Sequence, residues 1–482
     1  MASPEAVPFA KTGGLADVAG ALPCELARLG HRVCLVIPRY GAIDGAALGL
    51  KEWRRLAVPT ALGTIKAAIE QGTLPDGQGR VLAVRHDPYF DRAGLYQESG
   101  RDYPDNLERF AFFSRAVLEL LPVLQNESGW VPDVLHAHDW QTALSLVYLR
   151  TRDAGAPRHA IRTMFTIHNI GYQGLFPARD YWKTGLGPEL FTPKTLEFYG
   201  SVNLMKGGLV FADSLTTVSP TYSREIQTPE FGFGLDGVLR ERQDRLAGII
   251  NGIDAALWNP ETDAYLPCRY SAADLSGKKV CKAAVQREMA LPVREEVPLL
   301  GIVSRLTEQK GLDLVADILP ELAMLDLQVA LLGSGDPATE ARFRALQAQF
   351  PRKVGLSIGF DDGLAHRIEA GADMFVMPSR YEPCGLSQLY SLRYGTVPIV
   401  RRTGGLADTV VSYSPQAIRE GRATGFLFGE ATKEALLATV LLALRVYAEG
   451  REWQALIRAG MAQDVSWAKS ARAYVELYRK ML

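Results

Sequence analysis

The sequence has few of the features that mark secreted, membrane-spanning or nucleic-acid-binding proteins. Its five cysteines are an odd number and form no Cys-x-x-Cys pair, which argues against a disulfide scaffold or a zinc site and fits a reducing compartment. No apolar run approaches the ~20 residues that a membrane helix needs. The formal net charge of −1 leaves no basic excess for nucleic acid or an anionic membrane. The opening MASPEAVPFAKTGG shows no basic stretch before an apolar core, so we expect no signal peptide and a cytoplasmic location.

The rest of the composition is that of an ordinary globular protein. The length of 482 residues predicts about two to four domains, each with its own core. Short apolar runs alternate with helical patterns, and most runs are continuous, as expected for strands covered by helices on both faces. This alternation predicts right-handed βαβ units and doubly wound α/β domains with parallel sheets. Strands are expected at residues 32–37, 81–84, 134–138, 163–168, 215–219, 299–304, 328–332, 374–377 and 397–400.

One short pattern occurs twice, near opposite ends of the chain. Residues 11–17 read KTGGLAD and residues 402–408 read RTGGLAD. Gly-Gly lets a backbone approach a ligand closely, and the N-terminus of a following helix favours negative charge. Coincidence in a chain rich in Ala, Gly and Leu is the alternative. We interpret the repeat as two domains that each place a Gly-Gly turn and a cation beside a shared phosphate-bearing ligand.

The domain boundary is expected just before the stretch IINGID. We therefore predict an N-terminal domain of residues 1–246 and a C-terminal domain of residues 247–462. Residues 463–482 form an amphipathic helical pattern. That helix is either the last core helix of the second domain or a strap that returns to the first.

Two charged loops follow predicted strands in the C-terminal half. Arg305 and Lys310 lie in SRLTEQKG between a strand and a helix, where two cations favour a diphosphate, although a solvated loop is the alternative. Glu382 lies in YEPCGL on a turn stiffened by Pro and Gly. Cys384 in the same turn has no apparent His partner, so we expect a packing or backbone role for it.

Histidines end two predicted strands in the N-terminal half. The stretch HAHDW at residues 136–140 suggests a metal site, but the chain has no D-x-D pair for a sugar-nucleotide metal, so a sugar contact is favoured. His168 ends the next strand, and a core histidine bonded to backbone is its alternative. The stretch GSGDPA at residues 333–338, with Asp361 further on, is the best evidence for a nicotinamide dehydrogenase, and it is weak.

Eight stretches spread over nearly the whole chain are long enough to be specific. They are KTGGLADV, HAHDWQ, FTIHNIGYQG, VSPTYSREI, IINGID, VSRLTEQKGLDL, PSRYEPCGLSQLYSLRYGT and RRTGGLADTV. In this order they resemble the bacterial glycogen synthase and starch synthase family of retaining glycosyltransferases. The resemblance implies a GT-B fold of two Rossmann-like domains, an active site in the cleft between them, and a C-terminal helix that crosses back to the first domain. The implied reaction transfers glucose from ADP-glucose to the non-reducing end of an α-1,4-glucan, either glycogen or a maltooligosaccharide, without a cofactor or metal.

The resemblance also implies roles for single residues. Glu382 matches the essential acid, and His168 matches the histidine that contacts the glucose. Arg305 and Lys310 match the pair that neutralises the leaving diphosphate, and Lys11 matches the donor-binding lysine. Further donor-binding positions are Gly14, Asp17, Asp139, Asn169, Asn251, Cys384, Gly385, Leu386, Thr403, Gly404 and Gly405, and the expected acceptor or sugar contacts are Tyr96, Asp139 and Trp140.

The start of the chain departs from the family pattern, which normally has a strand before the K-T-G-G loop. Pro4 and Pro8 suit a strand poorly. We expect either a truncated first strand or residues 1–3 as all that remains of it. Loss of a central strand would threaten the placement of Lys11. A catalytically impaired glucan-binding homologue therefore stays as an alternative, beside a UDP-glucose-dependent or other retaining transferase.

Overall fold

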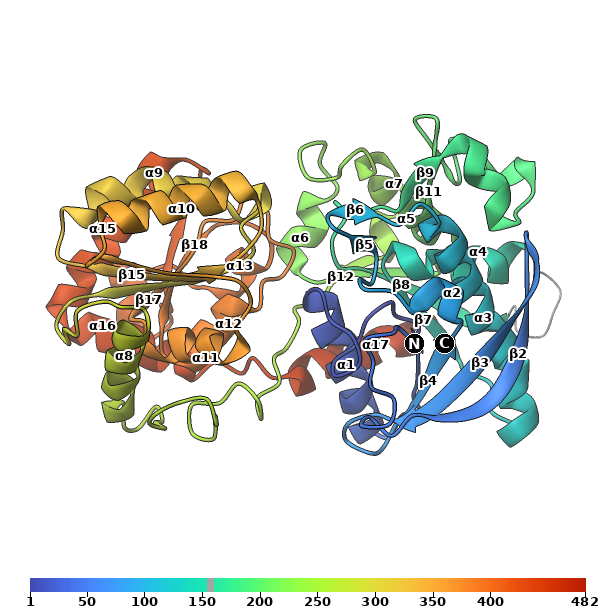
Figure 1. The fold of residues 1–482 in the computed structure, drawn as a ribbon, viewed down its shortest axis with the longest axis horizontal. Helices are drawn as coiled ribbons and strands as arrows, with labels where there is room; N and C mark the ends of the chain where they lie inside the picture. The colour runs from blue at the N-terminus through green and yellow to red at the C-terminus, as the bar shows by residue number, and fades with distance from the viewer. Residues whose placement is uncertain (154–159) are drawn as a thin grey trace. The chain divides into compact units, whose positions relative to one another are not determined.

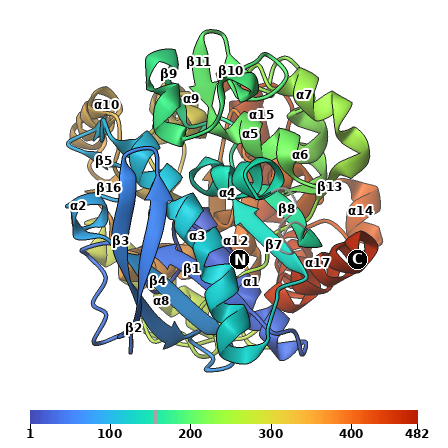
Figure 2. The same ribbon diagram turned by 90° about the vertical axis from the view of Figure 1, so that its right-hand side faces the viewer.

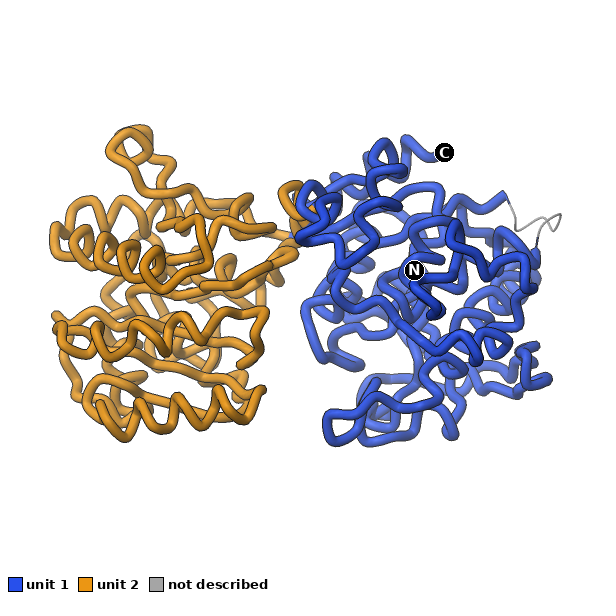
Figure 3. The backbone as a smooth tube through the Cα atoms, turned by 90° about the horizontal axis from the view of Figure 1, so that it is seen from above, with its two compact units in different colours: residues 1–218, 223–249, 467–482 blue, residues 219–222, 250–466 orange. Residues whose placement is uncertain are grey.

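The computed structural model describes residues 1–153 and 160–482, which form two compact units (Figure 3). Unit 1 contains residues 1–218, 223–249 and 467–482, and unit 2 contains residues 219–222 and 250–466. The chain therefore changes unit at residues 249–250, a few residues after the boundary expected from the sequence. Helix α17 (Trp467–Met481) ends the chain but belongs to unit 1.

The main sheet of unit 1 combines an antiparallel edge with parallel strands. Its strands are β1 (Cys34–Pro38), β2 (Lys51–Thr60), β3 (Gly63–Thr73), β4 (Arg80–Arg85), β7 (Val134–His138), β8 (Arg162–Ile167), β12 (Ser214–Thr217) and β13 (Leu246–Gly248). They pair in the orders β1-β4-β3-β2 and β13-β12-β8-β7. The parallel pairs β7–β8 and β8–β12 follow the continuous apolar runs of the sequence. The antiparallel hairpin β2–β3 has many exposed positions and no such run, and sequence analysis did not predict it.

Residues 1–3 join the two parts of this sheet. Ala2 forms parallel bridges to Val36 of β1 and to Ala137 of β7. The amide of Ala2 donates to the carbonyl of His136 at 2.8 Å, and the amide of His138 donates to the carbonyl of Ala2 at 3.1 Å. Ala2 is fully buried. Residues 1–3 therefore pair with both β1 and β7 and occupy a strand position between them.

Helices and short strands complete unit 1. They are α1 (Gly14–Arg28), α2 (Asp87–Phe90), α3 (Asn106–Ser128), α4 (Trp140–Thr151), α5 (Leu204–Phe211), α7 (Asp236–Glu241), η2 (Ala178–Thr184), η3 (Pro188–Leu190), η4 (Gln243–Arg245), β5 (Gln97–Glu98), β6 (Arg101–Asp102), β9 (Leu175–Pro177), β10 (Glu197–Phe198) and β11 (Ser201–Asn203). Helix α6 (Pro220–Glu225) begins in unit 2 and ends in unit 1. Helices α1 and α17 pack together over Met164 of β8, and Leu22, Trp467 and Tyr474 share that core (Figure 2). The apolar stripe of the C-terminal helix thus completes the core of unit 1.

Unit 2 contains a parallel sheet with strand order β16-β15-β14-β17-β18-β19. The strands are β14 (Leu299–Val303), β15 (Gln328–Gly333), β16 (Val354–Ile358), β17 (Met374–Met377), β18 (Val397–Arg401) and β19 (Phe426–Phe428). The chain runs outward from β14 to β16 and then returns to start β17 on the other side of β14. The point where this order reverses is where ligands bind in open α/β sheets, at the carboxyl ends of the strands.

Helices cover both faces of this sheet. They are η5 (Glu308–Lys310), α8 (Ser276–Glu288), α9 (Leu312–Ala323), α10 (Pro337–Gln349), α11 (Asp362–Gly371), α12 (Ser387–Arg393), α13 (Gly404–Thr409), α14 (Pro415–Arg419), α15 (Lys433–Glu449) and α16 (Arg451–Met461). Figure 1 shows α9 and α10 on one face and α8 and α11 on the other. Leu314 and Phe343 belong to the core under the first pair, and Val285 and Leu364 to the core under the second. In the described part of the chain, no helix has the length and apolar character needed to span a membrane.

Candidate functional site

The predicted site residues fall into one group in each unit. Unit 1 holds Lys11, Gly14, Asp17, Tyr96, Asp139, Trp140, His168 and Asn169, and unit 2 holds Asn251, Arg305, Lys310, Glu382, Cys384, Gly385, Leu386, Thr403, Gly404 and Gly405. The two groups are described separately below.

In unit 2, an ion pair joins the loops that follow β14 and β17. The Nζ of Lys310 lies 2.6 Å from Oε2 of Glu382, whose side chain is 6% exposed. The hydroxyl of Ser379 donates to the same oxygen at 2.9 Å. A buried carboxylate is stable only when it is paired and hydrogen-bonded, and both conditions are met here. The structure therefore brings together two residues that lie 72 positions apart in the sequence.

Further contacts hold the Lys310 loop and the Glu382 loop together. Arg380 forms a forked ion pair with Asp313 of α9, at 2.7 Å and 2.6 Å. The amide of Arg380 donates to the carbonyl of Gln309 at 2.8 Å. Gly311 has φ +64, and a Cβ there would clash with the carbonyl of Pro378. The glycine is required because the Lys310 loop turns left-handed and passes against the Glu382 loop.

A cavity of about 180 Å³ opens beside Lys310. Its lining includes Arg305 and Lys310 from the loop after β14, Ser379 from the loop after β17, and Ser387 at the start of α12. The cavity lies at the carboxyl ends of β14 and β17, where the strand order reverses. Arg305 is exposed, and its guanidinium has no hydrogen-bond partner within the described residues. Two cations and two hydroxyls around one cavity have the chemistry that suits a phosphate-bearing ligand.

The RTGGLAD loop packs directly on the Glu382 turn. Helix α13 begins at Gly404, after the buried Thr403. The amide of Gly405 donates to the carbonyls of Glu382 at 3.1 Å and Pro383 at 3.2 Å. Gly404 has φ +44, and a Cβ there would clash with the Glu382 carbonyl. The Gly-Gly turn thus positions the backbone of Glu382.

The remaining predicted residues of unit 2 surround this turn. Burial raises the pKa of the Cys384 thiol to about 12, so the thiol stays protonated at neutral pH and is a poor nucleophile. Asn251 is also buried, and its Oδ1 has no hydrogen-bond partner in the described structure. The side-chain amide of Gln388 donates to the carbonyls of Cys384 and Gly385, at 3.0 Å each. Leu386 precedes α12 and packs against the main core of unit 2.

The glycine-rich stretch GSGDPA does not form a dinucleotide fingerprint. Gly333 and Gly335 pass close to the carbonyls of Ser304 and Leu306, so these glycines allow two loops to pack. The Asp361 side chain accepts from the amide of Leu364 and caps α11. The Asp361 carboxylate is therefore already hydrogen-bonded in the helix cap, whereas a dehydrogenase would need it to bind the ribose.

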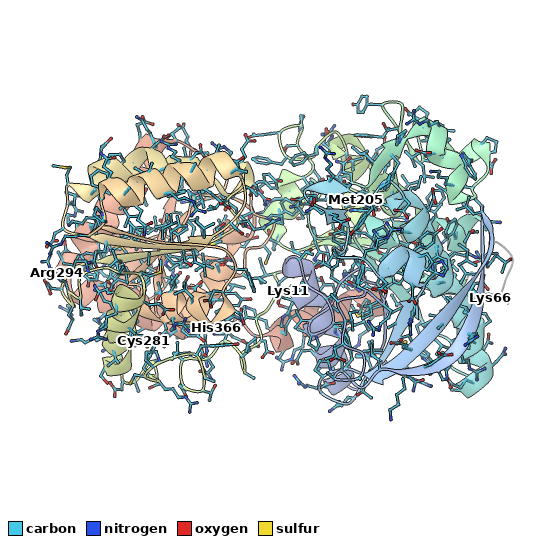
Figure 4. The ribbon with its side chains drawn as sticks, viewed as in Figure 1. Lys11, Lys66, Met205, Cys281, Arg294 and His366 are labelled. Carbon is cyan, nitrogen blue, oxygen red and sulfur yellow. The ribbon has the colours of Figure 1, made fainter. Side chains whose placement is uncertain are left out.

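In unit 1, the KTGGLAD loop begins α1 near the surface. Gly14 is the first residue of α1, and Lys11 lies beside this end of the helix (Figure 4). The Nζ of Lys11 is 2.7 Å from Oδ1 of Asp17, and the two side chains are 48% and 23% exposed. An exposed pair of this kind adds little stability, so Lys11 can bind an external anion at small cost.

Sequence analysis missed the residue that holds this loop. The Glu5 carboxylate accepts from the amide of Thr12 at 2.5 Å and from its hydroxyl at 2.6 Å. The hydroxyl of Tyr96 donates to the same carboxylate at 2.7 Å. Glu5 is 4% exposed. The available signal was an acid eight residues before the Gly-Gly turn, but it lies in a stretch with no regular pattern.

His168 lies at the end of a line of buried histidines. Its Nε2 is 2.9 Å from Nδ1 of His138, and the ring of His138 stacks on His136 at a centroid distance of 4.2 Å. Burial lowers the pKa of His168 to about 3 and also depresses the pKa values of His136 and His138. The rings are therefore neutral at pH 7. The alternative interpretation of His168 was a core histidine bonded to backbone. His168 is 8% exposed, as expected for a core residue, but its ring bonds to another histidine ring.

Asp139 follows His138 and hydrogen-bonds to the backbone at His168. Its Oδ1 accepts from the amide of His168 at 2.7 Å. Burial raises the pKa of Asp139 to about 8, against the opposing effect of the backbone amides of His168 and Asn169. The residue has φ +54, an uncommon conformation for a side chain other than glycine. The HAHDW and HNIGYQG motifs therefore form one hydrogen-bonded site.

Two further predicted residues lie around it. Trp140 begins α4 and makes edge contacts with Phe110 at 5.1 Å and Phe176 at 5.8 Å. The side chain of Asn169 accepts from the amide of Gly171 at 2.9 Å and so shapes the turn after His168. Both ring nitrogens of His136 are bonded to hydroxyls, those of Tyr478 and Thr166. Among the described residues no group of three His, Cys, Asp or Glu side chains could hold a metal ion.

Sequence analysis also missed an exposed aromatic ring in unit 2. Phe360 follows β16 and is 87% exposed. It lies after a strand of the same parallel sheet, at the same edge as the loops of Arg305 and Glu382. An exposed ring at a ligand-binding edge provides a surface on which a flat ligand ring can stack.

Comparisons with known proteins agree with this geometry. A model of the starch synthase catalytic domain matches residues 1–241, and a model of group 1 glycosyl transferases matches residues 288–454. The chain is 51% identical to the glycogen synthase of Anaeromyxobacter dehalogenans over 99% of this chain and 98% of the relative. It is 49% identical to the glycogen synthase of Syntrophotalea carbinolica over 100% of this chain and 98% of that protein.

A solved structure is similar over the whole length. The catalytic domain of starch synthase IV from Arabidopsis thaliana, bound to ADP and acarbose, has a TM-score of 0.91 and 34% identity, and covers 100% of this chain and 98% of its own. The expected GT-B fold and hexosyltransferase activity are thus confirmed. The chain belongs to the glycogen synthase and starch synthase family of retaining glycosyltransferases.

Proposed function

We propose that this chain transfers glucose from ADP-glucose to the non-reducing end of an α-1,4-glucan, with retention at the anomeric carbon. The observation that carries the proposal is the cavity at the strand reversal of unit 2, where Arg305 and Lys310 lie beside the buried Glu382. The ADP and acarbose in the Arabidopsis relative support a nucleotide-sugar donor and a glucan acceptor.

In this proposal, unit 2 binds the diphosphate. Arg305 forks onto phosphate oxygens, and Lys310 approaches as a point charge. Lys310 is already placed by its 2.6 Å contact with Glu382, so little rearrangement is needed when the ligand enters. The amide end of α13 adds partial positive charge near the Glu382 turn.

Unit 1 contributes groups that suit a sugar. His168 is neutral, and its Nδ1 has no partner in the described structure, so it is available to a glucose hydroxyl. Trp140, Tyr96 and Asp139 are proposed as further sugar contacts. Lys11 is proposed as an additional cation for the donor, because its ion pair with Asp17 is exposed.

The chemical step requires charge stabilisation more than acid–base catalysis. The bond from the anomeric carbon to the diphosphate oxygen breaks, and both its electrons leave with ADP. Arg305 and Lys310 stabilise that developing negative charge, so neither a metal nor a cofactor is required in this proposal. The acceptor 4-hydroxyl attacks from the side of the leaving group, and its proton passes to the departing phosphate. No enzyme base takes part.

The test is nucleoside diphosphate release from ADP-glucose and from UDP-glucose, with and without glycogen, in EDTA. Glycogen-dependent ADP release in EDTA is the expected result. Faster release of UDP from UDP-glucose would show that UDP-glucose is the donor instead of ADP-glucose. No release from either donor by a folded protein would support the impaired glucan-binding homologue instead.

A further inference from the structure

The ring of His138 lies beside two other imidazoles at the carboxyl end of β7. It stacks on His136 at a centroid distance of 4.2 Å, and its Nδ1 lies 2.9 Å from Nε2 of His168. His138 has no exposed surface, and the hydroxyl of Thr142 donates to its carbonyl at 2.8 Å. The ring is therefore held in one orientation, with Nδ1 directed at His168.

The two nitrogens of the His138 ring have different surroundings. Nδ1 faces His168, whereas Nε2 is buried and has no hydrogen-bond partner among the residues that the structure describes. His136 cannot supply one, because both its ring nitrogens are already bonded to the hydroxyls of Tyr478 and Thr166, at 2.7 Å and 2.6 Å. Within the described part of the chain, the contact with His168 is thus the single polar contact of the His138 ring.

A hydrogen bond between two neutral imidazoles contains one proton, which belongs to one ring or to the other. Burial lowers the pKa values of His138 and His168, so neither ring carries a second proton at pH 7. If the shared proton belonged to His168, the proton of His138 would lie on Nε2 and form a buried N–H without an acceptor. If it belongs to His138, the same Nε2 is only an unused lone pair. Buried N–H groups without a partner are rarer than unused acceptors, so the second arrangement is favoured.

The position of this proton determines what His168 presents to a ligand. Its Nε2 is occupied as an acceptor, so its own proton lies on Nδ1, and that N–H has no partner among the described residues. A fixed N–H donates to an oxygen lone pair, such as that of a sugar hydroxyl. The bare nitrogen of the other tautomer would require the hydroxyl to donate instead. The two tautomers therefore orient the same hydroxyl in opposite ways.

We propose that His138 is a positioning residue for glucosyl transfer: its Nδ1–H donates to Nε2 of His168 and so keeps the free N–H of His168 available to a hydroxyl oxygen of the transferred glucose. This inference rests on the proposed function, because it takes a glucosyl group as the ligand beside His168. His138 itself does not touch the sugar, and neither ring gains or loses a proton in the chemical step.

The first test reads the tautomer of His168 in the full chain. ¹⁵N NMR of the imidazole rings distinguishes a protonated from a bare ring nitrogen, and comparison with His168→Asn assigns the signals among the seven histidines. We expect His168 of the wild type to carry its proton on Nδ1 at pH 7. A proton on Nε2 of His168 would overturn the proposal. This measurement needs no catalysis and decides the assignment even where a variant fails to fold.

The variants His138→Asn and His138→Leu form a matched pair. Both side chains branch at Cγ and have nearly the same shape, and both lose the stacked ring, but only the Asn amide offers an N–H at the position of Nδ1. His138→Asn should keep the tautomer of His168, whereas His138→Leu should give a mixture of both forms. The kcat/KM for ADP-glucose should be about two- to tenfold lower in His138→Leu than in His138→Asn, the range of one neutral hydrogen bond. The KM for glycogen should be equal in the two variants.

The sugar contact is tested separately with substrate analogues. Each monodeoxy analogue of ADP-glucose lacks one hydroxyl, and the difference between the two variants in ADP release should disappear for the analogue that lacks the hydroxyl bound by His168. A difference that persists with every analogue would overturn the proposal, because a packing defect alone would explain it. Equal kcat/KM of the two folded variants with ADP-glucose would overturn it as well. Failure of the wild type to release ADP would remove the proposed function, while the ¹⁵N signal of His168 would still decide its tautomer.

Discussion

The same pattern, Thr-Gly-Gly-Leu-Ala-Asp, begins a helix in each unit, but its surroundings differ. In unit 1, Gly13 is extended at φ −160, and a Cβ there would have no neighbour within 4 Å. In unit 2, Gly404 is left-handed, and a Cβ there would clash with the Glu382 carbonyl. One sequence thus forms an open turn in one place and a packed turn in the other. The pattern predicts that a helix begins at the Gly-Gly pair, whereas the neighbouring loop determines the backbone conformation and the space left for a side chain.

The chemistry beside the two turns differs in the same way. Unit 1 keeps its polar groups buried and uncharged, with the pKa of His168 lowered to about 3 and the pKa of Asp139 raised to about 8. Unit 2 keeps a formal ion pair between Lys310 and Glu382 beside an exposed Arg305. Neutral hydrogen-bonding groups suit a sugar, and fixed cations suit a phosphate. This difference supports the proposed function, in which unit 2 binds the diphosphate and unit 1 contacts sugar.

The largest effect is expected from the charged pair of unit 2. Glu382→Gln keeps the shape and hydrogen-bonding ability of the side chain but removes the charge that holds Lys310. Lys310→Ala removes one cation from the cavity. Each change should lower kcat by about 10²–10³-fold, because the Lys310 cation is either absent or no longer held in place beside the leaving group. Initial rates of ADP release at saturating donor and glycogen measure the loss.

A matched control is available in the same unit. Asp317 forms an exposed ion pair with Arg342, with side chains 38% and 44% exposed. Asp317→Asn is the same kind of acid-to-amide change and should leave kcat unaltered. Thermal unfolding of all three variants separates lost activity from lost structure. Near-normal turnover in either Glu382→Gln or Lys310→Ala would end the assignment of that residue.

The next effect concerns the uncharged groups of unit 1. Burial lowers the pKa values of His136, His138 and His168. These rings therefore stay neutral in the folded chain at pH values at which the unfolded chain protonates them. Their stabilisation is present above the unfolded pKa of about 6.5 and is lost as the pH falls. Burial raises the pKa of Asp139 to about 8, so its contribution has the opposite sign and is lost as the pH rises through that value. Unit 1 should therefore be most stable near neutral pH.

The direction of the slope follows from these groups. As the pH falls below about 6.5, the unfolded chain gains protons on the three histidines, whereas burial keeps the pKa values of His136 and His138 low in the folded chain. The unfolding free energy of unit 1 should therefore fall as the pH falls through this range. His136→Gln should make this dependence on pH weaker, because one of the three histidines is removed. Hydrogen exchange of unit 1 peptides at several pH values measures it, and an unchanged slope in the variant would contradict the assignment.

Much of this fold could be predicted from continuous apolar runs. Residues 299–304, 328–332, 374–377 and 397–400 were expected as strands, and each overlaps a strand of the unit 2 sheet. The hairpin β2–β3 was missed because it lies at a sheet edge, where alternating exposure weakens the apolar signal. Residues 1–3 could be placed only as an alternative. Three residues are too few to show an apolar pattern, so this strand is identified only by its pairing with the neighbouring strands β1 and β7.

The site was predictable where its chemistry is carried by a motif. Lys310 and Glu382 were each expected to act in the same reaction, and the structure joins them. The contact of Glu5 with Tyr96 and the ion pair of Arg380 with Asp313 were not found, because each joins segments that lie far apart in the sequence.

The smallest effect sharpens the comparison of the two Gly-Gly turns directly. Gly404→Ala and Gly13→Ala add the same methyl group at matching positions of the repeat. Gly404→Ala should cost about 1–3 kcal/mol in unfolding free energy, because the alanine is left-handed and meets the Glu382 carbonyl.

The same substitution should also move Glu382 and lower kcat, so that activity and stability fall together. Gly13→Ala should change the unfolding free energy by no more than about 0.5 kcal/mol, since its backbone is extended and the added methyl meets no atom. Chemical denaturation of unit 2 and unit 1 in the two variants, followed by hydrogen exchange, measures both values. Equal costs at the two positions would show that the glycines are required by the repeat itself. A cost confined to Gly404 would show that the packed loop beneath it imposes the requirement.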